Sequence, residues 1–173
     1  MLLDLGRFTG GSAHVERRYA PKAFSGEEYT ATAEVALGFD LHKDGTRYRL
    51  VGTIETTLEL ACGRCLEPFS LPVAVGFDLR YLPQAENRGE DEREVEEDDL
   101  STAFYQGEAI NLGDLVREQL YLTLPMKPLC RAECRGLCPE CGANLNAVTC
   151  GCARRWDDPR LAPLRALFED RKD

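Results

Sequence analysis

The residues with the clearest chemistry are eight cysteines that stand in closely spaced pairs. Two of the pairs have the form Cys-x-x-Cys, and they are Cys62 with Cys65 and Cys138 with Cys141. The remaining cysteines are Cys130, Cys134, Cys150 and Cys152. Zinc prefers four tetrahedral ligands, and a pair of nearby thiolates supplies two of them from one tight turn. The cysteines therefore predict structural zinc, with one ion or two.

Six of the cysteines fall within residues 130–152, which is more than one zinc can bind, so they must be divided. The compact choice is Cys138 and Cys141 with Cys150 and Cys152, because the segment between these pairs is rich in the glycine and asparagine that tight turns use. The other four cysteines, Cys62, Cys65, Cys130 and Cys134, can then hold a second zinc. That ion would close a loop of roughly 70 residues and remove much of the entropy of the unfolded chain. The pairing is a hypothesis.

Three other uses of the same sulfurs compete with zinc. Disulfides require an oxidising compartment, whereas thiols stay reduced in the cytosol. An iron–sulfur cluster also takes four thiolates, but Cys-x-x-Cys turns followed by glycine and asparagine are more typical of zinc. A redox dithiol normally opens a helix that lowers the pKa of its thiol. Cys62 and Cys65 instead lead into the strand-like segment 69–73, so zinc remains the prediction.

The sequence offers little that predicts catalysis. It has two histidines, His14 and His42, and the spacing suggests no carboxylate or serine partner for either. The phosphate-binding, metalloprotease and serine-hydrolase motifs are absent. Sites made only of cysteine are closed and structural, because hydrolytic zinc needs an open position. We therefore expect a protein that is not an enzyme.

Composition and the N-terminal segment indicate in which compartment the protein lies. The chain has 173 residues, 43% of them hydrophobic, and a net charge of −9. The segment that begins at Met1 lacks the basic start and the apolar run of a signal peptide. No stretch approaches the roughly 20 apolar residues of a membrane span. We expect a cytoplasmic protein without a membrane partner, in which eight cysteines indicate metal rather than disulfides.

Alternating apolar residues predict the strands that position the first cysteine pair. Such alternation runs through residues 29–41, 48–60 and 69–81, and it places one face of each strand on a core. Asp44-Gly45 is typical of a hairpin turn. A further strand is expected within residues 1–20 and a short one near 102–105. Cys62 and Cys65 would then stand at the tip of a β-hairpin.

Helical signals follow the strands. Asn111 can cap a helix over residues 111–124, with Asp114 in its first turn and Pro125 at its end. Leucines after Asp158-Pro159 suggest a short C-terminal helix. The predicted fold is α+β: an antiparallel meander or partly closed sheet with one or two helices and a Cys-rich zinc-binding segment. We divide it into a β-rich core domain, residues 1–125, and a zinc-binding segment, residues 126–173.

Charge is unevenly distributed along the chain. Nine of the fourteen residues in 86–99 are acidic, which predicts a solvated loop within residues 83–100. Residues 127–165 carry a net charge of +3, with seven basic and four acidic residues. Arginines beside a tryptophan can contact phosphates and stack on bases. The candidate RNA contacts are Lys127, Arg131, Arg135, Arg154, Arg155, Trp156 and Arg160.

Several runs together resemble one bacterial family. They are the helix-forming run 110–125, the segment 136–146 with its Cys-Pro-Glu-Cys-Gly, the upstream Cys62-Gly-Arg-Cys-Leu-Glu-Pro68, and the closing Asp158-Pro-Arg160. Over roughly residues 30–170 the chain resembles the YceD family, the large ribosomal RNA subunit accumulation proteins.

The resemblance implies a role in the accumulation or processing of 23S rRNA during assembly of the large ribosomal subunit, without a known catalytic activity. The implied partners are 23S rRNA or its precursor, or assembly intermediates. Some relatives lack several of the tail cysteines, which favours zinc as a structural staple. The alternative function is a zinc-stapled adaptor that binds a basic protein through the acidic loop.

Overall fold

The computed structural model describes residues 1–8, 10–86 and 101–152 of the chain. These residues form two compact units. Unit 1 comprises Met1–Gly63 and Glu67–Cys130, and unit 2 comprises Arg64–Leu66 and the chain from Arg131 onward. Unit 1 holds the sheet and the helix. None of the helices in the described part of the chain has the length and apolarity that crossing a membrane requires.

The main sheet of unit 1 has six strands in the order β2-β4-β5-β6-β7, with β3 also paired to β5. Their bounds are β2 Ser12–Tyr19, β3 Thr30–Ala31, β4 Val35–Asp44, β5 Arg47–Ala61, β6 Pro68–Pro83 and β7 Thr102–Tyr105. Neighbours pair antiparallel except β6 and β7, which pair parallel. The strands predicted within residues 1–20 and near 102–105 are present as β2 and β7. The predicted strand over 29–41 is divided into β3 and β4.

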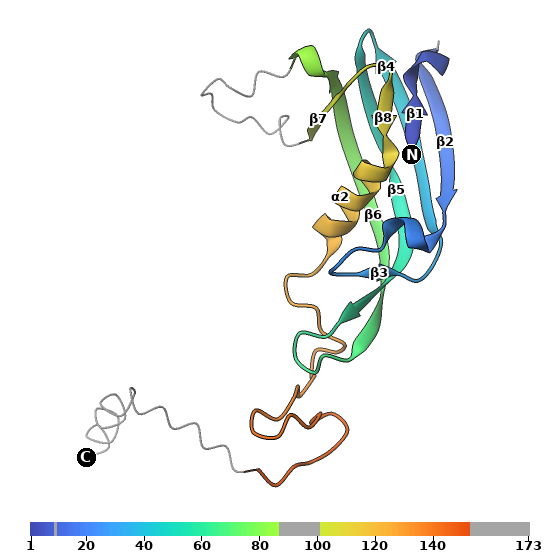
Figure 1. Ribbon diagram of the computed structural model, residues 1–173. Helices are drawn as coiled ribbons and strands as arrows, with labels where there is room; N and C mark the ends of the chain where they lie inside the picture. The colour runs from blue at the N-terminus through green and yellow to red at the C-terminus, as the bar shows by residue number, and fades with distance from the viewer. Residues whose placement is uncertain (9, 87–100, 153–173) are drawn as a thin grey trace, which may run out of the picture. The chain divides into compact units, whose positions relative to one another are not determined.

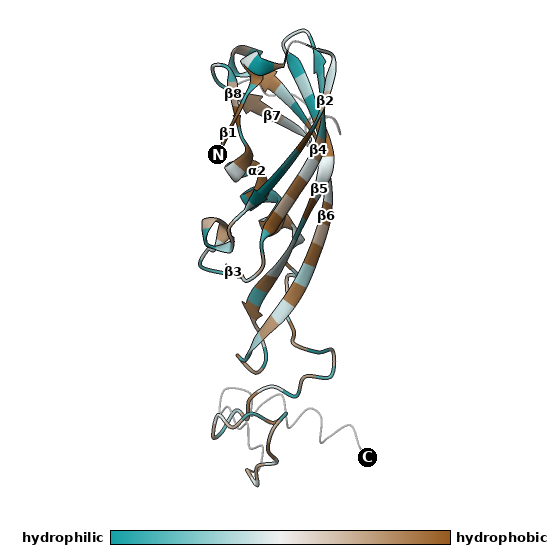
Figure 2. Ribbon diagram, turned by 90° about the vertical axis from the view of Figure 1, so that its right-hand side faces the viewer, coloured by the Kyte–Doolittle hydropathy of each residue, from teal (hydrophilic) through white to brown (hydrophobic). Residues whose placement is uncertain are grey.

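The hairpin of β5 and β6 is the longest element of the sheet. Its register runs without interruption from Tyr48 opposite Tyr81 to Ala61 opposite Pro68. Alternation along both strands sends one set of side chains to the core and the other to solvent. Figure 2 shows the resulting bands of hydrophobic and hydrophilic residues along the strands. The tight turn between β4 and β5 uses Gly45, whose φ of 60° suits the predicted Asp-Gly turn.

The sheet is open, so the predicted partial closure is wrong. Strands β2 and β7 end the strand order, and they do not pair with each other in the described residues. A closed barrel fills its interior with the side chains of its own strands. Here the apolar face is covered by α2, Leu112–Thr123, and by a two-stranded ribbon of β1, Leu2–Asp4, and β8, Ala109–Asn111 (Figure 1).

Helix α2 forms where its capping signals predict it. The Asn111 side chain accepts a hydrogen bond from the Gly113 amide at 3.0 Å, which satisfies a donor that the first turn leaves open. Its apolar residues join the core formed by the sheet and the ribbon. The fully buried members of that core include Phe39, Leu50, Ile54, Leu58, Ile110, Leu112, Leu115 and Leu120. Short 3-10 turns occur at Leu5–Arg7, Pro21–Phe24 and Gln84–Glu86.

Two glycines on paired strands differ in the space around them, and they give a matched test of packing. A Cβ atom at Gly52 would overlap the Gly38 carbonyl oxygen, whereas one at Gly38 meets nothing within 4 Å. We expect Gly52→Ala to lower the free energy of unfolding by about 2 kcal/mol or more, because backbone must move to relieve the overlap.

The control variant, Gly38→Ala, should stay within about 0.5 kcal/mol of the wild type. Urea unfolding followed by circular dichroism measures both. Equal stability of the two variants would contradict the close approach of β4 and β5 at Gly52.

Candidate metal centres

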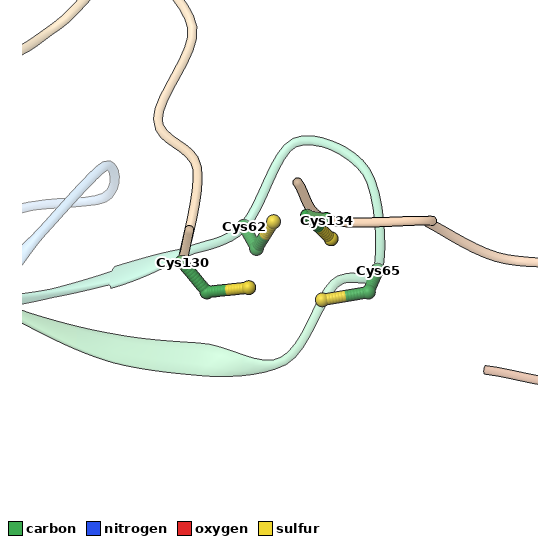
Figure 3. Close-up of side chains that lie close together, drawn as sticks. All are labelled: Cys62, Cys65, Cys130 and Cys134. Atoms are coloured by element: carbon green, nitrogen blue, oxygen red, sulfur yellow. The ribbon is translucent and has the colours of Figure 1, made fainter. Parts of the chain in front are cut away.

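The first cysteine set consists of Cys62, Cys65, Cys130 and Cys134. Their sulfur atoms all lie within 4.8 Å of one another and could hold a metal ion. Figure 3 shows the four side chains pointing toward a common centre. Tetrahedral zinc with Zn–S bonds of about 2.3 Å places its sulfurs about 3.8 Å apart. The arrangement therefore has the ligand type and the spacing that zinc requires.

The turn that carries Cys62 and Cys65 joins β5 to β6. The Cys62 amide donates to the Glu67 carbonyl at 2.9 Å, which closes the turn. In unit 1 the Gly63 amide donates to the Pro128 carbonyl at 2.8 Å, so the chain that follows α2 runs beside this hairpin tip. Cys62 and Cys65 are buried, and Cys130 is partly exposed.

Unit 2 supplies hydrogen bonds around Cys134. The Arg64 Nη1 donates to the carbonyls of Cys134 at 2.9 Å and Ala132 at 3.3 Å. The Asn146 Nδ2 donates to the Cys134 sulfur at 3.2 Å. An N–H donor at sulfur stabilises the thiolate that a metal needs, and it fixes the orientation of the ligand. Sequence reasoning missed both roles. It treated Asn146 only as a turn residue, and no spacing signal connects it to Cys134.

The second set consists of Cys138, Cys141, Cys150 and Cys152, and its sulfurs also lie within 4.8 Å of one another. All four belong to unit 2. Cys138 is buried, Cys150 is partly exposed, and the other two are exposed. This set is therefore closer to solvent than the first. The structure brings together the same two groups of four that the spacing suggested.

Backbone amides lower the pKa of one thiol in the second set. Hydrogen bonds from the backbone of Cys141 and then of Glu140, with a further contribution from the Cys150 side chain, lower the pKa of Cys138 to about 6. The neighbouring Cys141 thiol, followed by burial and by Cys138, raises the pKa of Cys152 to about 12. Four thiols this close cannot all ionise without a positive charge between them, because each thiolate repels the next. A bound dication would supply that charge.

The two Cys-x-x-Cys turns have the same backbone design. In each, the amide of the first cysteine donates to the carbonyl five residues later, from Cys62 to Glu67 at 2.9 Å and from Cys138 to Ala143 at 2.8 Å. The residue after the second cysteine has a left-handed conformation in both, with φ of 61° at Leu66 and 71° at Gly142. Glycine adopts this conformation freely, while leucine does so at a cost. The shared geometry indicates a shared role for the two turns.

The candidate RNA contacts are only partly described by the structure. Lys127, Arg131 and Arg135 are exposed. The Arg135 amide donates to the Asn146 side-chain oxygen at 2.8 Å, which ties it to the loop near Cys134. Arg154, Arg155, Trp156 and Arg160 lie outside the described residues, as do residues 87–99 of the acidic run and the predicted C-terminal helix. RNA contact by the tail and binding of a basic protein by the acidic run stay predictions.

The histidines differ from expectation in one respect. His14 has carboxylate partners that spacing did not suggest, because the register of β2 and β4 sets it opposite Asp40. Its Nδ1 lies 2.7 Å from an Asp40 oxygen and its Nε2 lies 3.5 Å from a Glu16 oxygen. The bond to Asp40, and then that to Glu16, raises the pKa of His14 above its usual value. The side chain is 60% exposed, so this is a surface ion pair.

A comparison with known protein families gives a match over the part of the chain that contains the cysteines. A model of the family "Large ribosomal RNA subunit accumulation protein YceD" matches residues 50–168, which is more than half of the chain and includes both cysteine sets. No solved structure matches the chain at a significant level.

Relatives occur in plants and bacteria. "Large ribosomal RNA subunit accumulation protein YCED homolog 1, chloroplastic" of Zea mays is 28% identical over 158 residues, covering 78% of this chain and 54% of the relative. The protein of the same name in Arabidopsis thaliana is 25% identical and covers 83% of this chain and 51% of the relative.

An uncharacterized protein of Mycobacterium tuberculosis is 31% identical over 125 residues, covering 72% of this chain and 57% of the relative. The chain thus spans about half the length of the curated relatives it matches. The family match and this bacterial relative lead to one conclusion: the chain belongs to the YceD family of large ribosomal RNA subunit accumulation proteins.

Proposed function

We propose that this protein is an accessory factor for the accumulation or processing of 23S rRNA and for assembly of the large ribosomal subunit. The observation that carries the proposal is the family match over residues 50–168. The names of the plant relatives link them to accumulation of the large ribosomal RNA subunit. The proposed partners are 23S rRNA, its precursor, or assembly intermediates, in the cytoplasm.

The proposed role does not depend on catalysis by the chain itself. Both cysteine sets offer four thiolates, which fill the coordination sphere of zinc and leave no position for a substrate or a reactive water. Catalytic zinc sites instead hold three protein ligands and one open position. The donor sets therefore support structural sites in a binding factor.

Each set is proposed to bind one structural zinc. The support is the soft, all-sulfur ligand set, the spacing of the sulfurs, and the N–H donors at Cys134 and Cys138. Bound zinc would supply the positive charge that keeps the thiolates together and would stabilise the folded chain. Asn146 would hold the Cys134 sulfur in place, while Arg64 would hold the backbone of its turn. Nothing in this role requires the metal to take part in a reaction.

Metal content tests the pairing of the cysteines. The wild type should contain two zinc ions per chain, and Cys62→Ser and Cys141→Ser should each contain one, because each variant lacks a ligand of a different set. The double variant should contain none. Purified proteins are measured by inductively coupled plasma mass spectrometry.

Thr149→Ser is the control for the metal measurement, since it changes an exposed residue beside the second set without touching a ligand. Loss of both ions in either single variant would show that the eight cysteines form one linked cluster. A wild-type protein that folds without any metal would contradict both sites.

The two zinc ions should contribute differently to the stability of the sheet. Cys62 is fully buried beside the sheet, and its set closes a loop of more than sixty residues, whereas the second set lies wholly in unit 2. We expect Cys62→Ser to lower the free energy of unfolding by about 3 kcal/mol or more. Cys141→Ser should change it by less than about 1 kcal/mol.

The measurement is urea unfolding followed by near-ultraviolet circular dichroism of tyrosine, because Tyr29, Tyr48 and Tyr81 lie in the core of unit 1. Equal losses in the two variants would argue against separate roles for the sets.

Cells of the native host test the function directly. Deletion of the gene should lower the ratio of 23S to 16S rRNA and the amount of mature large subunits in a sucrose gradient. The wild-type gene should restore both, and a Cys62→Ser gene should restore them poorly if the first zinc maintains the fold. Unchanged rRNA ratios and subunit profiles in the deletion strain would refute the proposed function.

A further inference from the structure

A basic row of His42, Arg49 and Arg80, which ends at Thr102, crosses the solvent-facing side of the sheet in unit 1. The strand register sets His42 opposite Arg49, Arg49 opposite Arg80, and Arg80 opposite Thr102. The row therefore runs over four adjacent strands, β4, β5, β6 and β7. Neighbouring strands lie about 4.8 Å apart, so the two arginines present their charges from adjacent positions of a rigid surface.

The row lines a pocket of about 470 Å³ at the end of the sheet near the β4–β5 turn. Five of its nine lining residues are basic or histidine and one is acidic. The full lining is His42, Lys43, Asp44, Arg47, Tyr48, Arg49, Arg80, Leu82 and Thr102. Charges of one sign in a recess with partly apolar walls focus the electric field and attract ions of the opposite sign. The lysine and arginines of the lining therefore favour an anion, while Asp44, Asp78 and Glu86 offset part of their charge.

The positive charge is local, since the whole chain has a net charge of −9. Along the exposed side of β5 the charge changes from Arg47 and Arg49 at one end to Glu55 and Glu59 toward the other. A polyanion that approaches this side of the sheet would be attracted at the pocket and repelled beyond it. Its binding would be confined to the basic end.

Ion pairs hold Arg49 and Arg47 in place. Arg49 donates from Nε and Nη2 to the carboxylate of Asp78, and Arg47 donates from Nη2 to Glu86 at 3.2 Å. The paired side chains are between 37% and 65% exposed, so water reaches both pairs, and a phosphate would share each guanidinium with its carboxylate. A guanidinium has five N–H donors, and the bonds to Asp78 use two of those of Arg49.

We propose that this pocket binds the phosphodiester backbone of RNA, with Arg49 and Arg80 as the main contacts. The proposal rests on the proposed function for the choice of RNA among polyanions. Arginine suits phosphate because its planar N–H groups match the phosphate oxygens. The site lies on the sheet of unit 1 and uses none of the tail residues 127–160 considered above.

The test uses the full-length protein loaded with zinc and a fluorescent oligouridylate of about 12 nucleotides. Fluorescence anisotropy gives Kd at several salt concentrations for the wild type and for the double variant Arg49→Glu/Arg80→Glu. The variant should bind about tenfold or more weakly, and its plot of log K against log salt should be shallower by about 1.4, which corresponds to two lost phosphate contacts.

The matched control is Arg17→Glu/Arg18→Glu, which makes the same change in charge on exposed residues of β2 in the same sheet. Its Kd should change by less than about threefold, because salt screens charges that lie farther than about 10 Å from the RNA. Circular dichroism checks that the variants fold. If the glutamate variant does not fold, Arg49→Gln/Arg80→Gln replaces it and should also weaken binding.

Unchanged affinity in the pocket variant, or an equal loss in the control, would overturn the assignment of the pocket. A wild-type protein that does not bind oligouridylate would overturn it as well. These outcomes are separate from the proposed function, which is refuted only by unchanged 23S rRNA and large subunits in the deletion strain.

Discussion

The uninterrupted pairing of β5 with β6 is the constraint on which both candidate sites depend. Its register runs from Tyr48 opposite Tyr81 to Ala61 opposite Pro68, a length of about 44 Å at 3.4 Å per residue. One end of this hairpin carries the turn with Cys62 and Cys65. The other end carries Arg49 opposite Arg80. A slip of one residue would move the arginines to the core side and would separate them from each other.

Most of the strands, the helix and the cysteine groups could be predicted from sequence because they depend on local signals. Alternation reveals which residues face the core, Asn111 marks the start of α2, and short spacings group the cysteines. The open sheet, the parallel pairing of β7 and the His14–Asp40 pair depend on register instead. Alternation identifies a face of a strand but does not say which residue lies opposite on the next strand.

The basic row shows the same limit most clearly. His42, Arg49, Arg80 and Thr102 are distributed over sixty residues of sequence, and each is unremarkable in its local context. They become neighbours only through three strand pairings. The uneven charge along the sequence instead favours the tail as the RNA-binding segment, and several of its candidate residues lie outside the described structure. The distribution of charge over the folded surface differs from that along the chain, because strand pairing places residues that are distant in sequence side by side.

The separation of the first cysteine set along the chain has a consequence for biosynthesis. Cys62 and Cys65 leave the ribosome long before Cys130 and Cys134, and at about 5–20 residues per second the delay is on the order of several seconds. By then every strand of the sheet and α2 have been synthesised. The four sulfurs can meet only after most of unit 1 is available to fold, so translation orders sheet formation before completion of this cluster.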